Sequence, residues 1–132
     1  MAGHAIEVIL SRQLADSLNI PVFIVDPEGN LLFYNAPAEE LLGRRFEDTG
    51  EMPMEEWSTS FYPTDADGTP IPSDKIPLVS SIKNQMPAHN NFWINSFDGR
   101  SVNISATAIP IVGRAGKFVG AMALFWDTES KV

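Results

Sequence analysis

The stretch Val22-Phe23-Ile24-Val25-Asp26-Pro27-Glu28-Gly29-Asn30-Leu31-Leu32-Phe33-Tyr34 decides the fold of this chain. Its two ends, 22–25 and 31–34, are short apolar runs with β-branched or aromatic residues, which is typical of β-strands. The Asp-Pro-Glu-Gly-Asn segment between them holds residue types that favour tight turns. The stretch therefore predicts a β-hairpin.

A short helix is predicted directly after this hairpin. Asn35 suits the N-cap position, because its side-chain oxygen can accept a hydrogen bond from a free amide of the first helical turn. Pro37 follows in that first turn, where its missing N–H costs little. Gly43 suits the position just beyond the last turn of a helix. We therefore expect a capped helix over residues 36–42.

Helical spacing of apolar residues recurs on both sides of this centre. Upstream it predicts an amphipathic helix over residues 5–18. Downstream, a short helix is expected over residues 54–61. A further helix is expected to be capped by Ser73 and to end before Pro87. The apolar stripe of the first helix consists of Ile6, Ile9, Leu10, Leu14 and Leu18.

The last third of the chain changes to the two-residue period of β-strands. Strands are expected over residues 90–96, 101–111 and 118–126. The third of these is almost wholly apolar, which favours a central strand that is buried on both faces. Together with the hairpin and the short helices, this order of elements predicts an α+β fold with an antiparallel sheet.

Composition limits the functions that the chain can have. Its 132 residues are enough for one domain, and it contains no cysteine, which excludes disulfides and thiolate chemistry. The net charge is −8, and the segment 39–74 alone carries a net charge of −8, with ten acidic and two basic residues. A chain so acidic is a poor partner for nucleic acid. No segment reaches the length of a membrane span, and no secretory signal is found, so we expect a cytoplasmic protein.

The chain resembles a PAS domain over about residues 14–127. The resemblance implies a five-stranded antiparallel sheet with short helices on one face around a small cavity, and an N-terminal helix that mediates dimerisation. It is closest to the stand-alone, single-domain PAS proteins of actinobacteria. The motifs that carry it are the hairpin 22–30, Phe33-Tyr34-Asn35-Ala36-Pro37-Ala38, Leu41-Leu42-Gly43, Asp67-Gly68-Thr69-Pro70-Ile71-Pro72, Ile76-Pro77-Leu78, Asp98-Gly99-Arg100 and Phe118-Val119-Gly120.

The resemblance divides the chain into an N-terminal helix (1–20), a PAS domain (21–127) and a short tail (128–132). It implies a sensory or signalling module that binds a small apolar or aromatic ligand and acts through a homodimer or a protein effector. A ligand-free dimerisation module is the alternative. The dimer interface is expected on the stripe of the first helix. The predicted cavity residues are Leu41, Trp57, Phe61, Ile76, Val79, Phe92, Ile94, Ile104, Met122 and Leu124.

The sequence restricts cofactors and chemistry further. Covalent cofactors that need cysteine are excluded. A non-covalent flavin could stack on Trp57, Phe61, Phe92 and Trp93, and a haem could take His89 as its iron ligand; both are weaker alternatives to a plain apolar ligand. No nucleophile, general base and oxyanion site occur together, so we expect no enzyme activity and no catalytic residues. The segment 65–69 lacks the further oxygen ligands of a calcium loop and is interpreted as a turn, so no metal site is predicted.

Overall fold

The computed structural model describes residues 6–96 and 98–128, and its fold is α+β with one five-stranded antiparallel sheet. The N-terminal residues 1–5 and the tail 129–132, parts of two predicted segments, lie outside the described residues. The helices are α1 (Ile6–Ser17), α2 (Ala36–Leu42), α3 (Phe46–Thr49), α4 (Met54–Ser60) and α5 (Pro77–Asn84), with 3-10 turns η1 (Ser73–Lys75) and η2 (Arg114–Gly116). The strands are β1 (Val22–Val25), β2 (Leu31–Tyr34), β3 (Ala88–Asn95), β4 (Ser101–Val112) and β5 (Phe118–Asp127).

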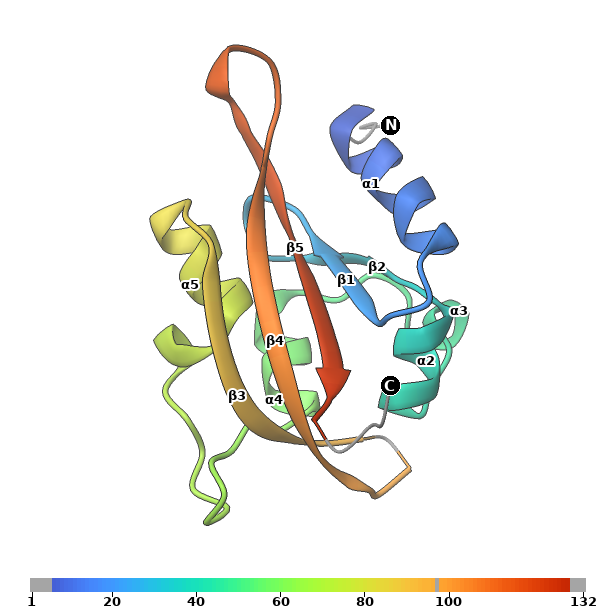
Figure 1. Cartoon of the computed structure of the whole chain (residues 1–132), viewed down its shortest axis with the longest axis vertical. Helices are drawn as coiled ribbons and strands as arrows, with labels where there is room; N and C mark the ends of the chain where they lie inside the picture. The colour runs from blue at the N-terminus through green and yellow to red at the C-terminus, as the bar shows by residue number, and fades with distance from the viewer. Residues whose placement is uncertain (1–5, 97, 129–132) are drawn as a thin grey trace.

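The sheet separates two hydrophobic clusters. On one face, side chains of α2, α4 and α5 pack against inward-facing residues such as Phe23 and Ile104. On the other face, α1 packs through Val8 and Ala15 against outward-facing residues such as Ile24 and Met122, and Phe46 of α3 packs at the edge of the same cluster. Figure 1 shows this division, with α4 and α5 behind the sheet and α1 apart from them. The alternation of side chains along each strand therefore decides which cluster a residue joins.

The strand order is β2-β1-β5-β4-β3, which confirms the prediction that the last strand is central. β5 lies against β1 at a very close approach, where Gly120 has a φ of 149° and a Cβ at this position would lie 2.4 Å from the Val25 carbonyl oxygen. The segment between β2 and β3, which contains α2 to α5, contacts both edge strands of the sheet. Leu31 of β2 bridges to Met52, and Trp93 of β3 bridges to Thr64. These two bridges attach the helical segment to opposite edges of the sheet and hold it over one face.

The helix predicted to begin at Ser73 begins later. Residues 73–75 form the 3-10 turn η1, and Ile76 is extended before α5 starts at Pro77. The reason is that a proline disfavours helical backbone in the residue before it, while its own fixed φ suits the first helical position. Ser73 makes no capping hydrogen bond. The short helix α3 was not predicted from the sequence.

Helix α1 forms where predicted, but its apolar stripe does not face the sheet. The side chains of Ile6, Ile9, Leu10 and Leu14 are 65%, 46%, 56% and 52% exposed. Leu18, just beyond the helix, is half-buried against the sheet. The residues that hold α1 down are instead its small ones, Val8 and Ala15. The dimerisation role of the stripe stays a prediction.

Asn35 joins three segments through one buried side chain, which is 1% exposed. Its Oδ1 accepts hydrogen bonds from the backbone N–H of Val22 (3.0 Å) and of Ala38 (3.2 Å). Its Nδ2 donates to the carbonyl oxygens of Ala15 and Ile20, both at 2.9 Å. The predicted N-cap is therefore confirmed. The same amide also fixes the end of α1 and the start of β1.

We predict that Asn35→Ala lowers the free energy of unfolding by about 2–5 kcal/mol, because the Val22 and Ala38 N–H groups lose their acceptor and the Ala15 and Ile20 carbonyl oxygens lose a donor at once. Asn35→Asp should cost at least as much, although it keeps the capping oxygen. A buried carboxylate would face the carbonyl oxygens of Ala15 and Ile20, to which it cannot donate. Urea unfolding of the two variants and the wild type measures both effects. A loss of less than about 1 kcal/mol in Asn35→Ala, the size of an ordinary cap, would contradict the role of Asn35 as a junction.

Candidate functional site

A cavity of about 60 Å³ lies between the sheet and the helices that cover its inner face. Strands β1, β3, β4 and β5 form its floor, and residues from α2, α4 and α5 close it from the other side. Every residue that lines it is apolar. The lining consists of Phe23, Leu42, Trp57, Phe61, Pro63, Ile76, Pro77, Leu78, Phe92, Ile94, Ile104, Ala106, Ala123 and Phe125.

Phe23 is the centre of an aromatic cluster in the wall of this cavity. Its ring stacks on Tyr34, with ring centroids 5.4 Å apart. It also meets Trp57, Phe61 and Phe125 edge to face, with centroid distances of 6.0, 5.9 and 5.8 Å. Such arrangements add stability beyond the apolar area that they bury. The cluster packs this part of the wall closely.

The polar atoms of the aromatic side chains are bonded to the protein. The Trp57 Nε1–H donates to the carbonyl oxygen of Gly29 at 2.8 Å. The Tyr34 hydroxyl lies 3.0 Å from the Arg44 carbonyl oxygen, to which it donates, and 3.2 Å from the Thr49 hydroxyl. Burial raises the pKa of this phenol, so it is neutral at ordinary pH. The cavity wall therefore offers a ligand apolar contact and aromatic faces.

Six of the ten predicted cavity residues line the cavity, namely Trp57, Phe61, Ile76, Phe92, Ile94 and Ile104. Leu41 is half-buried at the edge of the same cluster, and its neighbour Leu42 lines the cavity instead. Val79 is buried in the cluster without lining the cavity. Whether any of these residues binds a ligand stays a prediction.

Met122 and Leu124 require a correction, because they lie on the opposite face of the sheet, in the cluster under α1. Their neighbours Ala123 and Phe125 line the cavity. The cause is the one-residue shift that exchanges the two faces of a strand. Strand β5 is apolar on both faces, so its own sequence carries no alternation from which the inward side chains could be identified.

Other lining residues were missing from the sequence-based set, above all Phe23. A partial signal for Phe23 and Ala123 existed, since the sequence of β4 alternates between apolar residues, Ala108 among them, and polar ones. Ala108 pairs with Ala123, and Ala123 pairs with Phe23. Directly opposed residues share a face, so the pairing would have placed both residues inward. The sequence alone does not give this strand pairing, so the alternation of β4 could not be carried over to β5 and β1.

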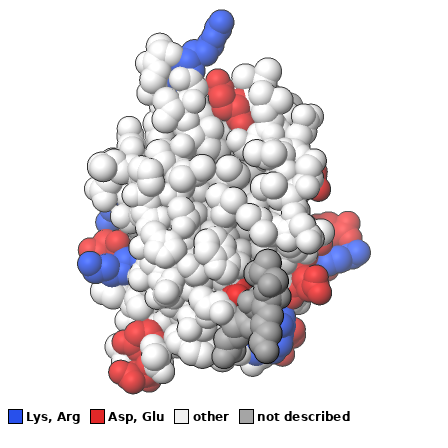
Figure 2. Space-filling view, in the orientation of Figure 1, with Lys and Arg blue, Asp and Glu red and all other residues white. Residues whose placement is uncertain are grey.

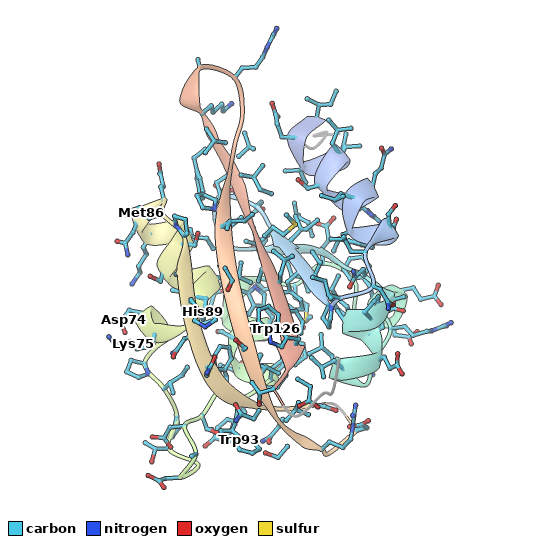
Figure 3. All side chains as sticks on the ribbon, viewed as in Figure 1. Asp74, Lys75, Met86, His89, Trp93 and Trp126 are labelled. Carbon is cyan, nitrogen blue, oxygen red and sulfur yellow. The ribbon has the colours of Figure 1, made fainter. Side chains whose placement is uncertain are left out.

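The residues expected to contact a flavin or a haem do not all line the cavity. Trp57, Phe61 and Phe92 line the cavity, whereas Trp93 does not. His89 is exposed, and its Nδ1 lies 2.7 Å from the Thr107 hydroxyl of the neighbouring strand. Its ring therefore does not reach the cavity that a haem would occupy. Figure 3 shows His89 and Trp93 on β3. Within residues 6–96 and 98–128, no three His, Asp or Glu side chains gather as metal ligands would.

The turn between β3 and β4 is fixed to the end of helix α2, which carries Leu42 into the cavity. The Arg100 Nη2 donates to the carbonyl oxygens of Glu40 (3.0 Å) and Leu41 (3.2 Å). The Arg100 Nε forms an ion pair with Asp98 at 2.9 Å, and the Ser96 hydroxyl donates to Asp98 as well. Arginine at the carbonyl end of a helix satisfies groups that have no partner within the helix.

The fold and the cavity together define a class of protein, in which one antiparallel sheet and a layer of short helices enclose a small apolar core. The model of the PAS domain family matches residues 10–76. The chain belongs to the PAS domain family. This confirms the family expected from the sequence, and with it the five-stranded fold. PAS domains are in general sensory or regulatory modules rather than enzymes, and they commonly mediate dimerisation or partner binding.

Solved structures give the same fold. A PAS domain from Colwellia psychrerythraea has a TM-score of 0.65 and 20% identity over 93% of this chain and 99% of its own. The PAS domain of the fruit-fly ELK potassium channel has a TM-score of 0.69 and 13% identity over 97% and 100%. The Rhodobacter sphaeroides LOV protein has a TM-score of 0.72 and 12% identity over 94% and 68%. Comparison with curated protein sequences gave no significant match. Among the described helices, none has the length and apolar character to cross a membrane.

The Asp98–Arg100 pair predicts a specific pH dependence. Hydrogen bonds from Arg100 and Ser96 lower the pKa of Asp98 from 3.8 to about 2. The unfolded chain therefore takes up this proton first as the pH falls, so the contribution of Asp98 is complete above about pH 5 and is lost toward pH 2. The stability difference between the wild type and Asp98→Asn, from urea unfolding at several pH values, should shrink across that window. Parallel curves for the two proteins would contradict the assignment.

Proposed function

We propose that this chain is a sensory module whose core cavity binds a small, uncharged, apolar or aromatic molecule. The observation that carries the proposal is the cavity wall, which is apolar at every residue and partly built from aromatic rings. A charged or strongly polar ligand would lose its hydration there without gaining partners. An apolar ligand loses nothing of this kind and gains the contacts of the wall.

The size of the cavity supports a small ligand. Its volume of about 60 Å³ is far below the roughly 300–1,000 Å³ of ordinary cofactor and drug sites. It is also below the roughly 150 Å³ of an engineered cavity that takes benzene. A molecule of a few non-hydrogen atoms fits directly, and a single ring requires modest movement of the lining side chains. Flavin and haem are much larger, so the proposal excludes them in favour of a plain apolar ligand.

We further propose that the module passes its signal through association, as a homodimer in the cytoplasm, with an effector protein as a further partner. The observation that favours this is the stripe of Ile6, Ile9, Leu10 and Leu14, which α1 leaves exposed. Exposed apolar groups gathered on one face are typical of protein interfaces. The alternative function, a dimerisation module that binds no ligand, is supported by the same stripe.

The surrounding surface supports the same interpretation. Figure 2 shows that the face over β3, β4 and β5 is largely free of charged side chains, which lie mostly around its edge. Trp126 on this face is 42% exposed and is labelled in Figure 3. Interface cores are depleted of charged residues and enriched in aromatic ones. We therefore propose that α1 and this sheet face together form the association surface.

Toluene should bind in the core cavity of the whole chain, and the variant Ala123→Val should bind it at least tenfold more weakly. The two added methyl groups would occupy space that the ligand needs. Titration of the ¹⁵N-labelled protein, followed by amide chemical shifts, measures both affinities. In the wild type the shifts should include Ile94, Ile104 and Phe125.

The matched control for this titration is Met122→Leu, a change of similar volume at the adjacent position on the opposite face of β5. It should leave toluene binding unchanged, because Met122 lies under α1. Equal binding by the wild type and Ala123→Val, or shifts confined to the α1 face, would contradict a ligand in the core. Urea unfolding of both variants confirms that each one folds.

Sedimentation velocity tests the association surface. The wild type should sediment as a dimer, and the double variant Leu10→Gln/Leu14→Gln should sediment as a monomer, because two exposed apolar contacts are replaced by polar ones. Glutamine is a good helix former, so α1 itself should persist.

The control for the association test is Met86→Gln, which replaces an apolar residue that is 64% exposed in the connection between α5 and β3, remote from α1. Figure 3 labels this residue. It should leave the dimer intact. A wild type that stays monomeric, or a double variant that still dimerises, would contradict the role of the α1 stripe. Far-ultraviolet circular dichroism of each variant separates loss of association from loss of the helix.

A further inference from the structure

A second cavity lies on the other face of the sheet, between α1 and the strands β1 and β2. Its volume is about 140 Å³, and we call it the α1 cleft; it is lined by Val8, Ile9, Arg12, Ile24, Leu32 and Phe33. None of these residues lines the core cavity. Because the sheet separates the two cavities, a ligand in one does not touch the other.

Arg12 is the one charged residue in the lining of the α1 cleft. Its guanidinium carbon lies 4.4 Å from the centre of the Phe33 ring, so the cation stacks on an aromatic face. The ion pairs found among the described residues involve Arg45 and Arg100, and Arg12 takes part in none of them. Stacking leaves the N–H groups at the edge of a guanidinium available to an acceptor. Arg12 therefore presents donors beside an apolar wall.

Neither acidic residue of α1, Glu7 or Asp16, lines the cleft. The Glu7 carboxylate lies beside Gly113, where a Cβ would come within 2.9 Å of it. Glu7 does not line the cleft. The segment that carries the excess negative charge, residues 39–74, contributes no lining residue either. The overall charge of −8 is thus compatible with a local site for an anion.

We propose that the α1 cleft binds a small apolar carboxylate of about the size of benzoate. The ring would lie against Ile9, Leu32 and Phe33, and the carboxylate would accept hydrogen bonds from the Arg12 guanidinium. The volume of the cleft is close to that of an engineered cavity that takes benzene, roughly 150 Å³. Guanidinium and carboxylate match in geometry and can form two parallel hydrogen bonds. This site is independent of the ligand proposed for the core.

The test compares benzoate with benzamide, a neutral molecule of nearly the same shape, on the whole ¹⁵N-labelled chain. Benzoate should shift the amide signals of Val8, Arg12, Leu32 and Phe33 in a saturable manner, with a dissociation constant on the order of millimolar, as is usual for so small a ligand. Benzamide should bind about tenfold more weakly, because the charge-assisted hydrogen bonds are lost.

Two variants make the test specific for Arg12. Arg12→Gln should weaken benzoate about tenfold and leave benzamide nearly unchanged, whereas Arg12→Lys should restore part of the benzoate affinity. Arg45→Gln, which removes an exposed cation outside the cleft, should change neither ligand. Three outcomes would overturn the proposal: no saturable shift with benzoate, shifts confined to core residues such as Ile104 and Phe125, or equal benzoate affinity in Arg12→Gln. The last outcome would indicate apolar binding without a role for the cation.

Discussion

The structure depends on the buried side chain of Asn35. Its amide has two acceptor and two donor positions, and all four are used, by backbone groups of Ala15, Ile20, Val22 and Ala38. A buried amide that loses partners is costly, so the three segments can meet in only one arrangement. That arrangement fixes the end of α1, the first residue of β1 and the first turn of α2. Each cavity is bounded by elements that begin or end at this junction.

The second constraint is the position of β5 at the centre of the sheet. Its side chains point alternately to the helical face and to the α1 face, and both faces of the strand carry apolar side chains. Ala123 and Phe125 therefore belong to the core cavity, while Met122 and Leu124 belong to the cluster under α1. The α1 cleft takes no residue from β5 and is lined instead from α1, β1 and β2, so the two sites have different chemistry. The lining of the core cavity is wholly apolar, whereas the lining of the α1 cleft includes the guanidinium of Arg12.

Local signals in the sequence were sufficient where a residue's own chemistry determines the structure. Asn35, Gly43 and the turn 26–30 identified the first hairpin and helix because capping and turn formation are local. Met122 and Leu124 were misplaced because the inward face of an all-apolar strand is determined by its partners. The orientation of α1 was not predictable for a related reason. The sequence assigned its larger apolar residues to a dimer interface and gave no signal for the side that meets the sheet, where close packing uses the smaller Val8 and Ala15.

The shallow attachment of α1 has a mechanical consequence. At its C-terminal end the helix is attached to Asn35 through the Ala15 carbonyl oxygen. Val8 and Ala15 are the only buried residues of the helix. The area that holds it to the sheet is therefore small, and the α1 cleft reduces it further on the side of β2. The stabilisation from a few buried side chains is comparable to that from a small ligand or a dimer contact. Anything that binds under α1 or upon its exposed stripe therefore competes with a weak internal interaction, and the helix is the element of this fold whose position binding can most readily change.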